Sequence, residues 1–310
     1  MTTLYLTHPA CLEHESPPGH PERPDRLRAV WRVLDEARFG ALERRKAKLA
    51  DATSALLAHD ERYCETLPKL IPPEGRIAHV DADTYLSAHS WPAILYAMGA
   101  AVEGVDCVMR GEMKNAFCGT RPPGHHAERA RAMGFCLFNH VAVAARKAQR
   151  VHGAERVAIV DFDVHHGNGT QDIFWKDKSV LYASSHQWPL YPGTGAASET
   201  GEHDNIVNLP LASGTGPQVF RAAFESVILP RVDAFEPDLI LISAGFDAHR
   251  RDPLASLDLG EAEFGWVTRR LMEIAEQRCA GRIVSVLEGG YDLMGLSASA
   301  AAHVEALMEA

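Results

Sequence analysis

The sequence predicts an α/β protein built on a parallel sheet with helices on both faces. Short segments rich in Val, Ile and Leu alternate along the chain with amphipathic segments of helical length, which is the pattern of parallel strands joined by helices. The strand segments are continuous apolar runs, as expected for strands buried on both faces. Four of these runs end in glycine together with a residue capable of chemistry.

The predicted strands are short apolar runs that glycine or polar residues end. They are 3–7, 115–118, 157–160, 180–184, 206–211, 238–243 and 283–287. The predicted helices carry apolar residues on one face. They are a segment opened by Pro24, then 51–67, 84–109, 139–151, and segments through Phe220 to Ile228 and Phe264 to Leu271. Leu56 and Leu57 are expected to point inward, and Pro92 to interrupt the helical segment 84–109.

The composition is that of an ordinary globular protein. The chain has 310 residues, of which 46% are hydrophobic and 23% charged, enough for a large α/β core. There is no internal repeat, low-complexity segment or linker, so the sequence predicts a single domain over residues 1–310. The formal charge of −10, from 41 acidic and 31 basic residues, argues against nucleic-acid binding.

The chain shows no pattern of a targeting signal or a membrane span. Residues 1–15 lack a basic start followed by an apolar core, and the most apolar window, Trp91 to Val102, is too short to cross a bilayer. The six cysteines include no C-x-x-C pair, which is typical of reduced thiols. We therefore expect a cytoplasmic protein without a membrane partner, and no pattern indicates its oligomeric state.

Residues 157–172 carry the strongest chemical signal. The apolar run V-A-I-V is followed by D-F-D-V-H-H-G-N-G-T-Q-D. Asp161, Asp163 and His165 are two residues apart, so an extended backbone directs them to one side. They follow a strand at its carboxyl end, where open α/β sheets bind ligands. A polar strand end that merely caps a loop is the alternative, and the isolated pattern does not decide between the two.

Convergence of several strand ends favours a metal site. Asp247 follows another apolar strand, and the carboxyl ends of parallel strands meet at one edge of a sheet. Asp163, His165 and Asp247 would hold one divalent cation and leave a coordination position open for water, as a catalytic site requires. Two carboxylates and an imidazole suit Zn²⁺, and the ligand types also allow Fe²⁺.

Two further strand ends supply acid, base and hydrogen-bond donors. His125 and His126 follow the strand 115–118, and one of them would exchange protons with the attacking water. Tyr291 follows a Gly-Gly turn and would donate a hydrogen bond to a developing oxyanion. The alternatives are a histidine packed beneath the Pro-Pro-Gly turn and a tyrosine that closes the core.

Taken in order, six segments resemble the zinc-dependent histone deacetylase family, which includes bacterial histone-deacetylase-like amidohydrolases and acetylpolyamine amidohydrolases. They are G-T-R-P-P-G-H-H, G-F-C-L-F-N, D-F-D-V-H-H-G-N-G-T-Q, Y-P-G-T-G, S-A-G-F-D and E-G-G-Y. The resemblance covers nearly the whole chain. It implies the arginase-deacetylase fold with a central eight-stranded parallel sheet, and removal of an acyl group, usually acetyl, from an amine.

The resemblance also implies the role of each residue at the metal. Asp163, His165 and Asp247 match the ligands of one catalytic Zn²⁺ per chain. His126 matches the general base that later acts as acid, and His125 matches its electrostatic partner.

Supporting residues follow from the same resemblance. Tyr291 matches the tyrosine that polarises the scissile carbonyl. Asp161 and Asn168 match the hydrogen-bond partners of the two histidines, and asparagine at the second position is similar to class II enzymes. Asp161, Asp163 and Ser184 match side chains around a structural K⁺.

Substrate residues are implied as well. Phe135 and Tyr191 match the aromatic walls of an acyl-lysine tunnel, and Gly134 would accept the substrate amide N–H. Arg26 matches an arginine near an internal acetate-exit region. Polyamine-selective relatives have a glutamate where this chain has Leu254. We therefore expect an ε-acyl-lysine-type or related linear acyl-amine substrate, either a small molecule or a peptide, with acetylpolyamine as the second choice.

Two interpretations from other classes remain open at this point. An arginase-like ureohydrolase would share the fold, and S-A-G-F-D-A-H-R-R-D-P faintly resembles a dinuclear manganese motif, but Phe246 and His249 stand where that motif needs more acids. A non-catalytic acyl-binding or scaffold protein would be expected to lose a ligand or the tyrosine, and this chain has kept them all.

Overall fold

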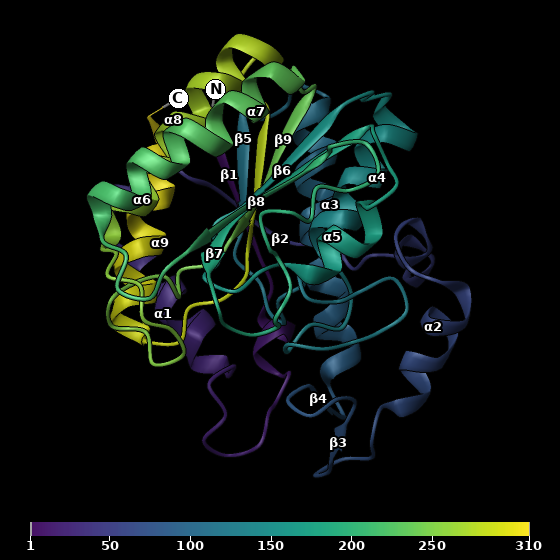
Figure 1. The fold of residues 1–310 in the computed structure, drawn as a ribbon. Coiled ribbons are helices and arrows are strands. Elements are labelled where there is room, and N and C mark those ends of the chain that lie inside the picture. Colours follow the sequence, from purple (N-terminus) through teal and green to yellow (C-terminus); the bar gives the residue numbers. More distant parts are fainter. Residues whose placement is uncertain (1, 310) are drawn as a thin grey trace.

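An eight-stranded parallel sheet forms the centre of the protein, as predicted (Figure 1). The computed structural model describes residues 2–309. The strands of the sheet are β1 (Thr3–Thr7), β2 (Glu43–Lys46), β5 (Asn115–Cys118), β6 (Val157–Asp161), β7 (Val180–Gln187), β8 (Ile206–Leu211), β9 (Leu239–Ala244) and β10 (Ile283–Leu287). Their order is β2-β1-β5-β10-β9-β6-β7-β8, and each neighbouring pair is parallel. A separate antiparallel pair consists of β3 (Ile77–His79) and β4 (Tyr85–Ser87).

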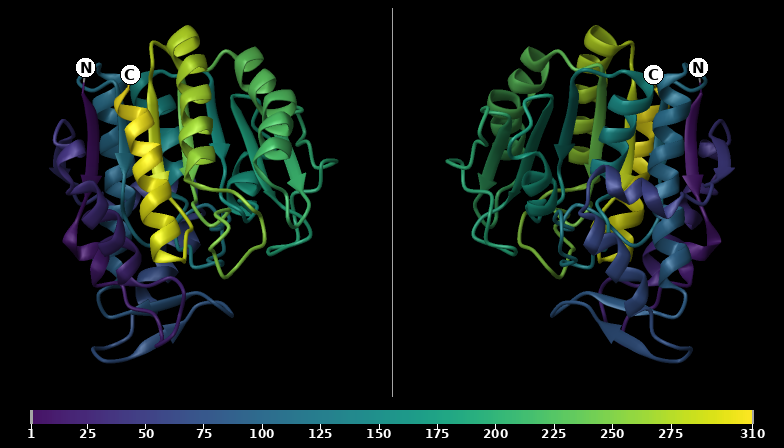
Figure 2. Two further views of the ribbon diagram at one scale, coloured as in Figure 1. Left: turned by 90° about the vertical axis from the view of Figure 1, so that its left-hand side faces the viewer. Right: turned by 90° about the vertical axis from the view of Figure 1, so that its right-hand side faces the viewer.

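Helices cover both faces of the sheet (Figure 2). One face is covered by α1 (Pro24–Leu34), α6 (Pro217–Ala223), α7 (Leu229–Phe235), α8 (Glu261–Cys279) and α9 (Leu293–Met308). The other is covered by α3 (Ser90–Met109), α4 (His140–His152) and α5 (Asn168–Phe174). The short α2 (Glu61–Thr66) lies outside this layer, against the 3₁₀ turns that flank it. A π-helical segment, Phe224–Ile228, joins α6 to α7, and short 3₁₀ turns span Pro9–Leu12, Ala37–Phe39, Ala52–Leu57 and Leu67–Leu70.

The central strands are buried on both sides. Along β6, Ala158 and Val160 pack into the core beneath α8 and α9, whereas Val157 and Ile159 pack into the core beneath α3 and α4. Successive side chains of a strand point to opposite faces, so two cores require an uninterrupted apolar run. The continuous apolar character of these strands therefore has the expected cause.

Strand order places the chemically interesting strand ends beside one another. β5, β10, β9 and β6 are consecutive in the sheet although they lie far apart in sequence. Because all four run in the same direction, the segments that follow them leave the sheet at one edge. This adjacency is what assembles the candidate site.

Two of the predicted helical segments differ from the structure. Residues 51–67 form a 3₁₀ segment followed by the short α2; since a 3₁₀ helix has three residues per turn, the expected α-helical face shifts. Leu56 is consequently exposed, whereas Leu57 packs partly against the core as predicted. In residues 84–109, the predicted helix is wrong at its start, where Tyr85–Ser87 form strand β4 and α3 begins only at Ser90. Pro92 therefore does not interrupt a helix: it lies in the first turn of α3, where a missing N–H costs little.

Four helices and strands were missed altogether: β2, β3, α5 and α9. β2 contains only charged residues, E-R-R-K, a composition that suits an edge strand but carries no apolar signal. α9 did carry a signal, since Leu296, Ala300 and Val304 are spaced by four residues and are buried. Its many alanines made that pattern weak in the sequence.

Among residues 2–309, α3 is the one helix long and apolar enough, by length and composition, to cross a membrane. It is longer than the apolar window seen in the sequence, and 72% of its most apolar 18-residue window is buried in the protein. It packs against α4, β5 and β10. A core helix meets the same criterion, so its length and composition are weak evidence for a membrane span.

Candidate active site

The three predicted ligands of the catalytic metal lie together at the carboxyl edge of the sheet. Asp163 and His165 follow β6, and Asp247 follows β9, the neighbouring strand. All three side chains are buried, and their ligand atoms lie within 4.8 Å of one another. The spacing of two residues seen in the sequence does direct the first two side chains toward one point.

Glycines make room for these carboxylates. A Cβ atom at Gly245 would lie 2.0 Å from Asp163 Oδ2, and one at Gly289 would lie 2.2 Å from Asp247 Oδ2. The backbone N–H of Gly289 also donates to Asp163 Oδ2 at 2.8 Å. The glycines of S-A-G-F-D and E-G-G-Y are therefore needed because the strand ends approach the carboxylates too closely for any side chain.

The electrostatics of this group fit a cation. Burial and the neighbouring Asp163 charge raise the pKa of Asp247 to about 7. Burial lowers the pKa of His165, but its hydrogen bonds to Asp163 and Asp247 outweigh burial and raise that pKa to about 10. The two buried carboxylates, 3.3 and 3.0 Å from His165 Nδ1, favour positive charge at this point, and a divalent cation would supply it.

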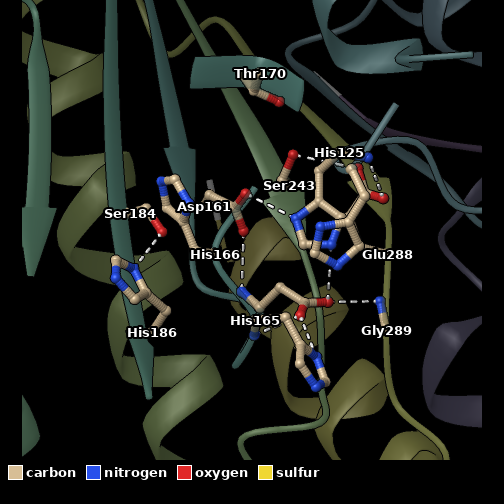
Figure 3. Close-up of polar contacts among 12 residues, drawn as sticks. His125, Asp161, His165, His166, Thr170, Ser184, His186, Ser243, Glu288 and Gly289 are labelled. Atoms are coloured by element: carbon tan, nitrogen blue, oxygen red, sulfur yellow. Dashed lines mark hydrogen bonds and ion pairs between the residues drawn. The ribbon is translucent and has the colours of Figure 1, made fainter. Parts of the chain in front are cut away.

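The tandem histidines lie beside the metal-type group with different partners. His125 Nδ1 is 3.0 Å from Asp161 Oδ2, and Tyr182 donates its hydroxyl to the same oxygen (Figure 3). Burial lowers the pKa of His125, but the charges of Asp161 and Asp163 outweigh it and raise that pKa to about 10. The two carboxylates therefore favour the charged form of His125.

His126 has the opposite character. Burial, with the charges of His125 and His165, lowers its pKa well below 6.5. Its Nδ1 lies 2.8 Å from Asn168 Oδ1, and the Asn168 amide donates to Glu128 Oε1 at 2.7 Å. Because the Asn168 NH₂ group is engaged by Glu128, its oxygen faces His126 and accepts the Nδ1–H. The Nε2 atom of His126 is left as a neutral base.

A cavity of about 200 Å³ leads to these residues. Its lining residues are Asp83, His126, Gly134, Phe135, His165, Leu190, Tyr191, Leu254 and Tyr291. The four predicted channel residues are therefore brought together with two predicted catalytic residues. Each aromatic channel residue contacts the ring of a predicted catalytic residue. The Phe135 ring lies 5.7 Å from the Tyr291 ring, and the Tyr191 ring lies 5.2 Å from the His126 ring.

One channel wall has an unusual backbone. Gly134 and Phe135 both have positive φ, 56° and 68°, and a Cβ at Gly134 would lie 2.4 Å from the His126 ring. The backbone N–H groups of Gly134 and Phe135 donate to Asp83 Oδ1 and Thr84 Oγ1, at 3.2 and 3.0 Å. The loop after β3 therefore holds this wall in a conformation that phenylalanine rarely adopts.

Glu288 is a site residue that the sequence interpretation missed. Its Oε2 accepts the N–H groups of Gly124 and His125, at 2.7 and 3.1 Å, and its Oε1 accepts the Ser243 hydroxyl (Figure 3). Burial raises its pKa to about 7. The motif E-G-G-Y contains it, but only the fold brings the histidine loop above it. Asp83 and Glu128 were missed for the same reason.

The remaining predicted residues lie around the centre. Arg26 is fully buried behind the cavity, with its guanidinium 4.8 Å from the Tyr291 ring; its exit role stays a prediction. Ser184 pairs with Asp161 across β6 and β7, but its hydroxyl bonds to His186 Nδ1 at 2.9 Å (Figure 3). The K⁺ assignment of these residues also stays a prediction.

Comparison with known proteins decides the family. The model of the histone deacetylase domain matches residues 20–307. The chain belongs to the histone deacetylase family. It is therefore a hydrolytic enzyme of the deacetylase and amidohydrolase class.

Individual relatives agree with this assignment. A probable deacetylase of Archaeoglobus fulgidus is 40% identical over 95% of this deacetylase-family chain and 83% of its own. A histone deacetylase-like amidohydrolase of Pseudomonas aeruginosa is 37% identical over 88% and 73%. The crystal structure of the HDA15 HD domain has a TM-score of 0.93 and 39% identity, over 99% of this chain and 88% of that one. The predicted fold class is confirmed.

The arginase-like alternative finds no support in this deacetylase-family site. Among residues 2–309, Asp163, His165 and Asp247 form the one group of metal-type ligands. His249 occupies a position where a dinuclear motif needs an acid, and its Nε2 lies 3.6 Å from Glu261 Oε2.

Proposed function

We propose that this enzyme is a zinc-dependent amidohydrolase that removes acetyl or another acyl group from ε-acyl-lysine-type or related linear acyl-amines. The observation that carries the proposal is the narrow cavity, whose walls are Phe135, Tyr191 and Leu254 and whose floor holds His126, His165 and Tyr291. A cavity of this size and lining accepts one linear aliphatic chain with the amide at its deep end.

The metal-type group defines where the acyl carbonyl would lie. Held by Asp163, His165 and Asp247, Zn²⁺ would act as a Lewis acid on the acyl oxygen and lower the pKa of the attacking water. The buried histidine and two carboxylates fit that ion in ligand type and charge. Water reaches the group through the cavity, since His165 is also part of the cavity lining.

His126 would move the protons. Its neutral Nε2 can take a proton from the attacking water and then give it to the leaving amine. Asn168 holds the ring in the required tautomer through Nδ1. His125, kept positive by Asp161, stabilises negative charge that develops beside it.

Tyr291 would bind the oxyanion. Burial raises the pKa of its phenol well above 10, so the hydroxyl stays protonated and remains a donor. A donor aimed at the developing charge typically contributes about 10²–10³ in kcat. On the substrate side, Gly134 lines the cavity, and its carbonyl would accept the scissile amide N–H.

An acetylpolyamine substrate is the alternative, and one observation favours it. The Asp83 carboxylate lines the same cavity, and a carboxylate there would attract a cationic chain. Leu254 opposes this preference, because it presents an apolar side chain where a second carboxylate would be useful. We therefore keep the lysine-type substrate as the first choice.

Turnover of an acetyl-lysine peptide and of acetylated putrescine or spermidine by the zinc-loaded enzyme separates the two. We expect faster peptide turnover, and a loss of about 10²–10³ in kcat for Tyr291→Phe on either substrate. Faster polyamine turnover that falls selectively in Asp83→Asn would reverse the choice of substrate. Turnover of neither substrate nor of longer acyl-amines would contradict the proposal.

A further inference from the structure

We infer that Asp252 is a positioning residue that holds Tyr291 and the channel wall Leu254 in one fixed register. This inference rests on the proposed role of Tyr291. Asp252 lies outside the cavity lining, so it acts through its neighbours and does not contact the substrate.

Three backbone N–H groups converge on this one carboxylate. Oδ2 accepts the N–H of Tyr291 at 2.7 Å and that of Asp292 at 3.3 Å. Oδ1 accepts the N–H of Leu254 at 3.0 Å. The side chain is 7% exposed, so water does not readily replace these bonds. A single buried group thereby connects the loop after β9 to the turn after β10.

The turn that Asp252 restrains has little stiffness of its own. Gly289 and Gly290 directly precede Tyr291, and Gly290 has φ 121°, a region open to glycine alone. Arg26 holds the other side of the turn, since its Nε donates to the Gly290 carbonyl at 2.7 Å. The backbone at Tyr291 is therefore held on both sides: Arg26 binds the carbonyl that precedes Tyr291, and Asp252 accepts the N–H of Tyr291.

Alignment of the Tyr291 hydroxyl is where this clamp matters. A hydrogen bond to an oxyanion depends steeply on distance and angle, and a displacement of about 1 Å can cost about 10²-fold in rate. Leu254, two residues beyond Asp252, forms the facing part of the wall. Loss of the carboxylate would therefore release the oxyanion donor and one wall of the channel together.

The first arm of the test compares two matched substitutions, Asp252→Asn and Asp238→Asn. Asp238 also accepts two backbone N–H groups, of Glu155 and Arg156 at 2.8 and 2.9 Å, but at the opposite end of β9. Asparagine keeps one acceptor and turns a donor toward the other N–H. In Asp252→Asn we expect kcat to fall about 10- to 100-fold because Tyr291 is released, and KM to rise by up to about threefold because the Leu254 wall is released. Both constants should be unchanged in Asp238→Asn.

The second arm repeats Asp252→Asn in the Tyr291→Phe background. Tyr291→Phe has no hydroxyl to align. If Asp252 acts by aligning that hydroxyl, adding Asp252→Asn to Tyr291→Phe should lower kcat by less than about threefold. An undiminished fall in that background would show that Asp252 acts on something other than Tyr291 and would overturn the inference. An equal fall in Asp238→Asn would reduce the effect to general destabilisation.

The third arm needs no turnover. Amide hydrogen exchange should accelerate at Tyr291 and Leu254 in Asp252→Asn and stay unchanged at Gly124 and His125, while zinc affinity in competition with a chromophoric chelator stays unchanged. Unchanged exchange at Tyr291 would overturn the inference even if activity fell. Inactivity of the unsubstituted enzyme on every acyl-amine would instead contradict the proposed function, and exchange would still report on Asp252.

Discussion

At the scale of single residues, the two tandem histidines differ because their hydrogen-bond partners differ. The Asp161 carboxylate, with Asp163, stabilises the charged form of His125 against the effect of burial. The Asn168 amide carries no charge, so burial and the neighbouring His125 charge keep His126 neutral. Adjacent residues of one type thus differ in which protonation state their surroundings favour. The roles that the resemblance implies for them stay a prediction.

Replacing His126 by alanine should separate proton transfer from metal binding. We expect His126→Ala to lower kcat by about 10²–10⁴ while the zinc content after dialysis stays that of the unsubstituted protein, because His126 is not among the clustered ligands. His165→Ala is the control and should lose zinc and activity together. Loss of zinc in His126→Ala would contradict the assignment of roles.

The site residues predicted from sequence and those missed differ in how they act. The predicted residues come within a few positions of the ends of apolar strands, so a local pattern in the sequence indicates them; they are Asp163, His165, Asp247 and Tyr291. Glu288 acts on backbone N–H groups of a loop far away in sequence. Such side chain to backbone bonds depend on which strands are neighbours, and no local pattern records that.

At the scale of elements, strand ends and glycines build the metal-type group together. Each strand stops where its neighbour's carboxylate needs space, and Gly245 and Gly289 leave that space. Gly245 and Gly289 do not have positive φ, whereas Gly290 does. Their requirement is therefore room for a carboxylate oxygen and not backbone conformation.

Gly245→Ala should weaken metal binding. The added Cβ would lie 2.0 Å from Asp163 Oδ2, a contact that must displace the ligand or the strand end. We expect zinc affinity, measured by chelator competition, to fall at least about tenfold, within the range reported for disturbing a ligand's support. Gly216→Ala, where a Cβ meets nothing within 4 Å, should leave affinity unchanged. Equal affinity in both variants would show that the strand end yields easily.

Helices and strands could be predicted where the apolar pattern of the sequence was strong and contacts with other segments did not change the local conformation. Seven of the eight strands of the sheet were anticipated because burial on both faces leaves a continuous apolar run. The charged β2 has no such run, because an edge strand packs little of its surface. The 3₁₀ segment Ala52–Leu57 had a helical composition, but its hydrogen-bond pattern is set by the turns around it.

At the scale of the whole molecule, several histidines are buried and neutral outside the metal-type group. Burial lowers the pKa of each to about 4, or about 3 for His303; they are His14, His59, His140, His186 and His303. An unfolded histidine titrates near 6.5. Below that pH the unfolded chain binds more protons than the folded one, so stability is lost as pH falls from about 6.5 toward 4.

Glu22 adds a second loss at lower pH. Burial raises the pKa of its carboxyl, but Arg121 and Arg26 outweigh burial and lower that pKa to about 2. The ion pairs therefore stabilise the fold above about pH 4.5, and this stabilisation disappears between about pH 4.5 and 2. Both effects make acid destabilising.

Urea unfolding at pH 7, 6 and 5 should show a steady fall in the free energy of unfolding. Each neutral buried histidine contributes up to about 2 kcal/mol of that fall by pH 5. His303→Gln places an amide near the position of Nε2, where it can replace the ring as partner of Ser285, and should reduce the slope by up to one proton. A variant with the same slope as the unsubstituted protein would show that His303 is protonated in the folded state.

The fold class, the parallel sheet and the residues at the ends of β6, β9 and β10 could be predicted from local sequence, because strands buried on both faces appear as apolar runs with recognisable endings. Which strands are neighbours could be learned only from the folded protein. That order brings Asp247 beside Asp163, Glu288 beneath the histidine loop and Asp252 against Tyr291. The physical reason is that these contacts join segments distant in sequence, and their geometry follows from packing of the entire sheet.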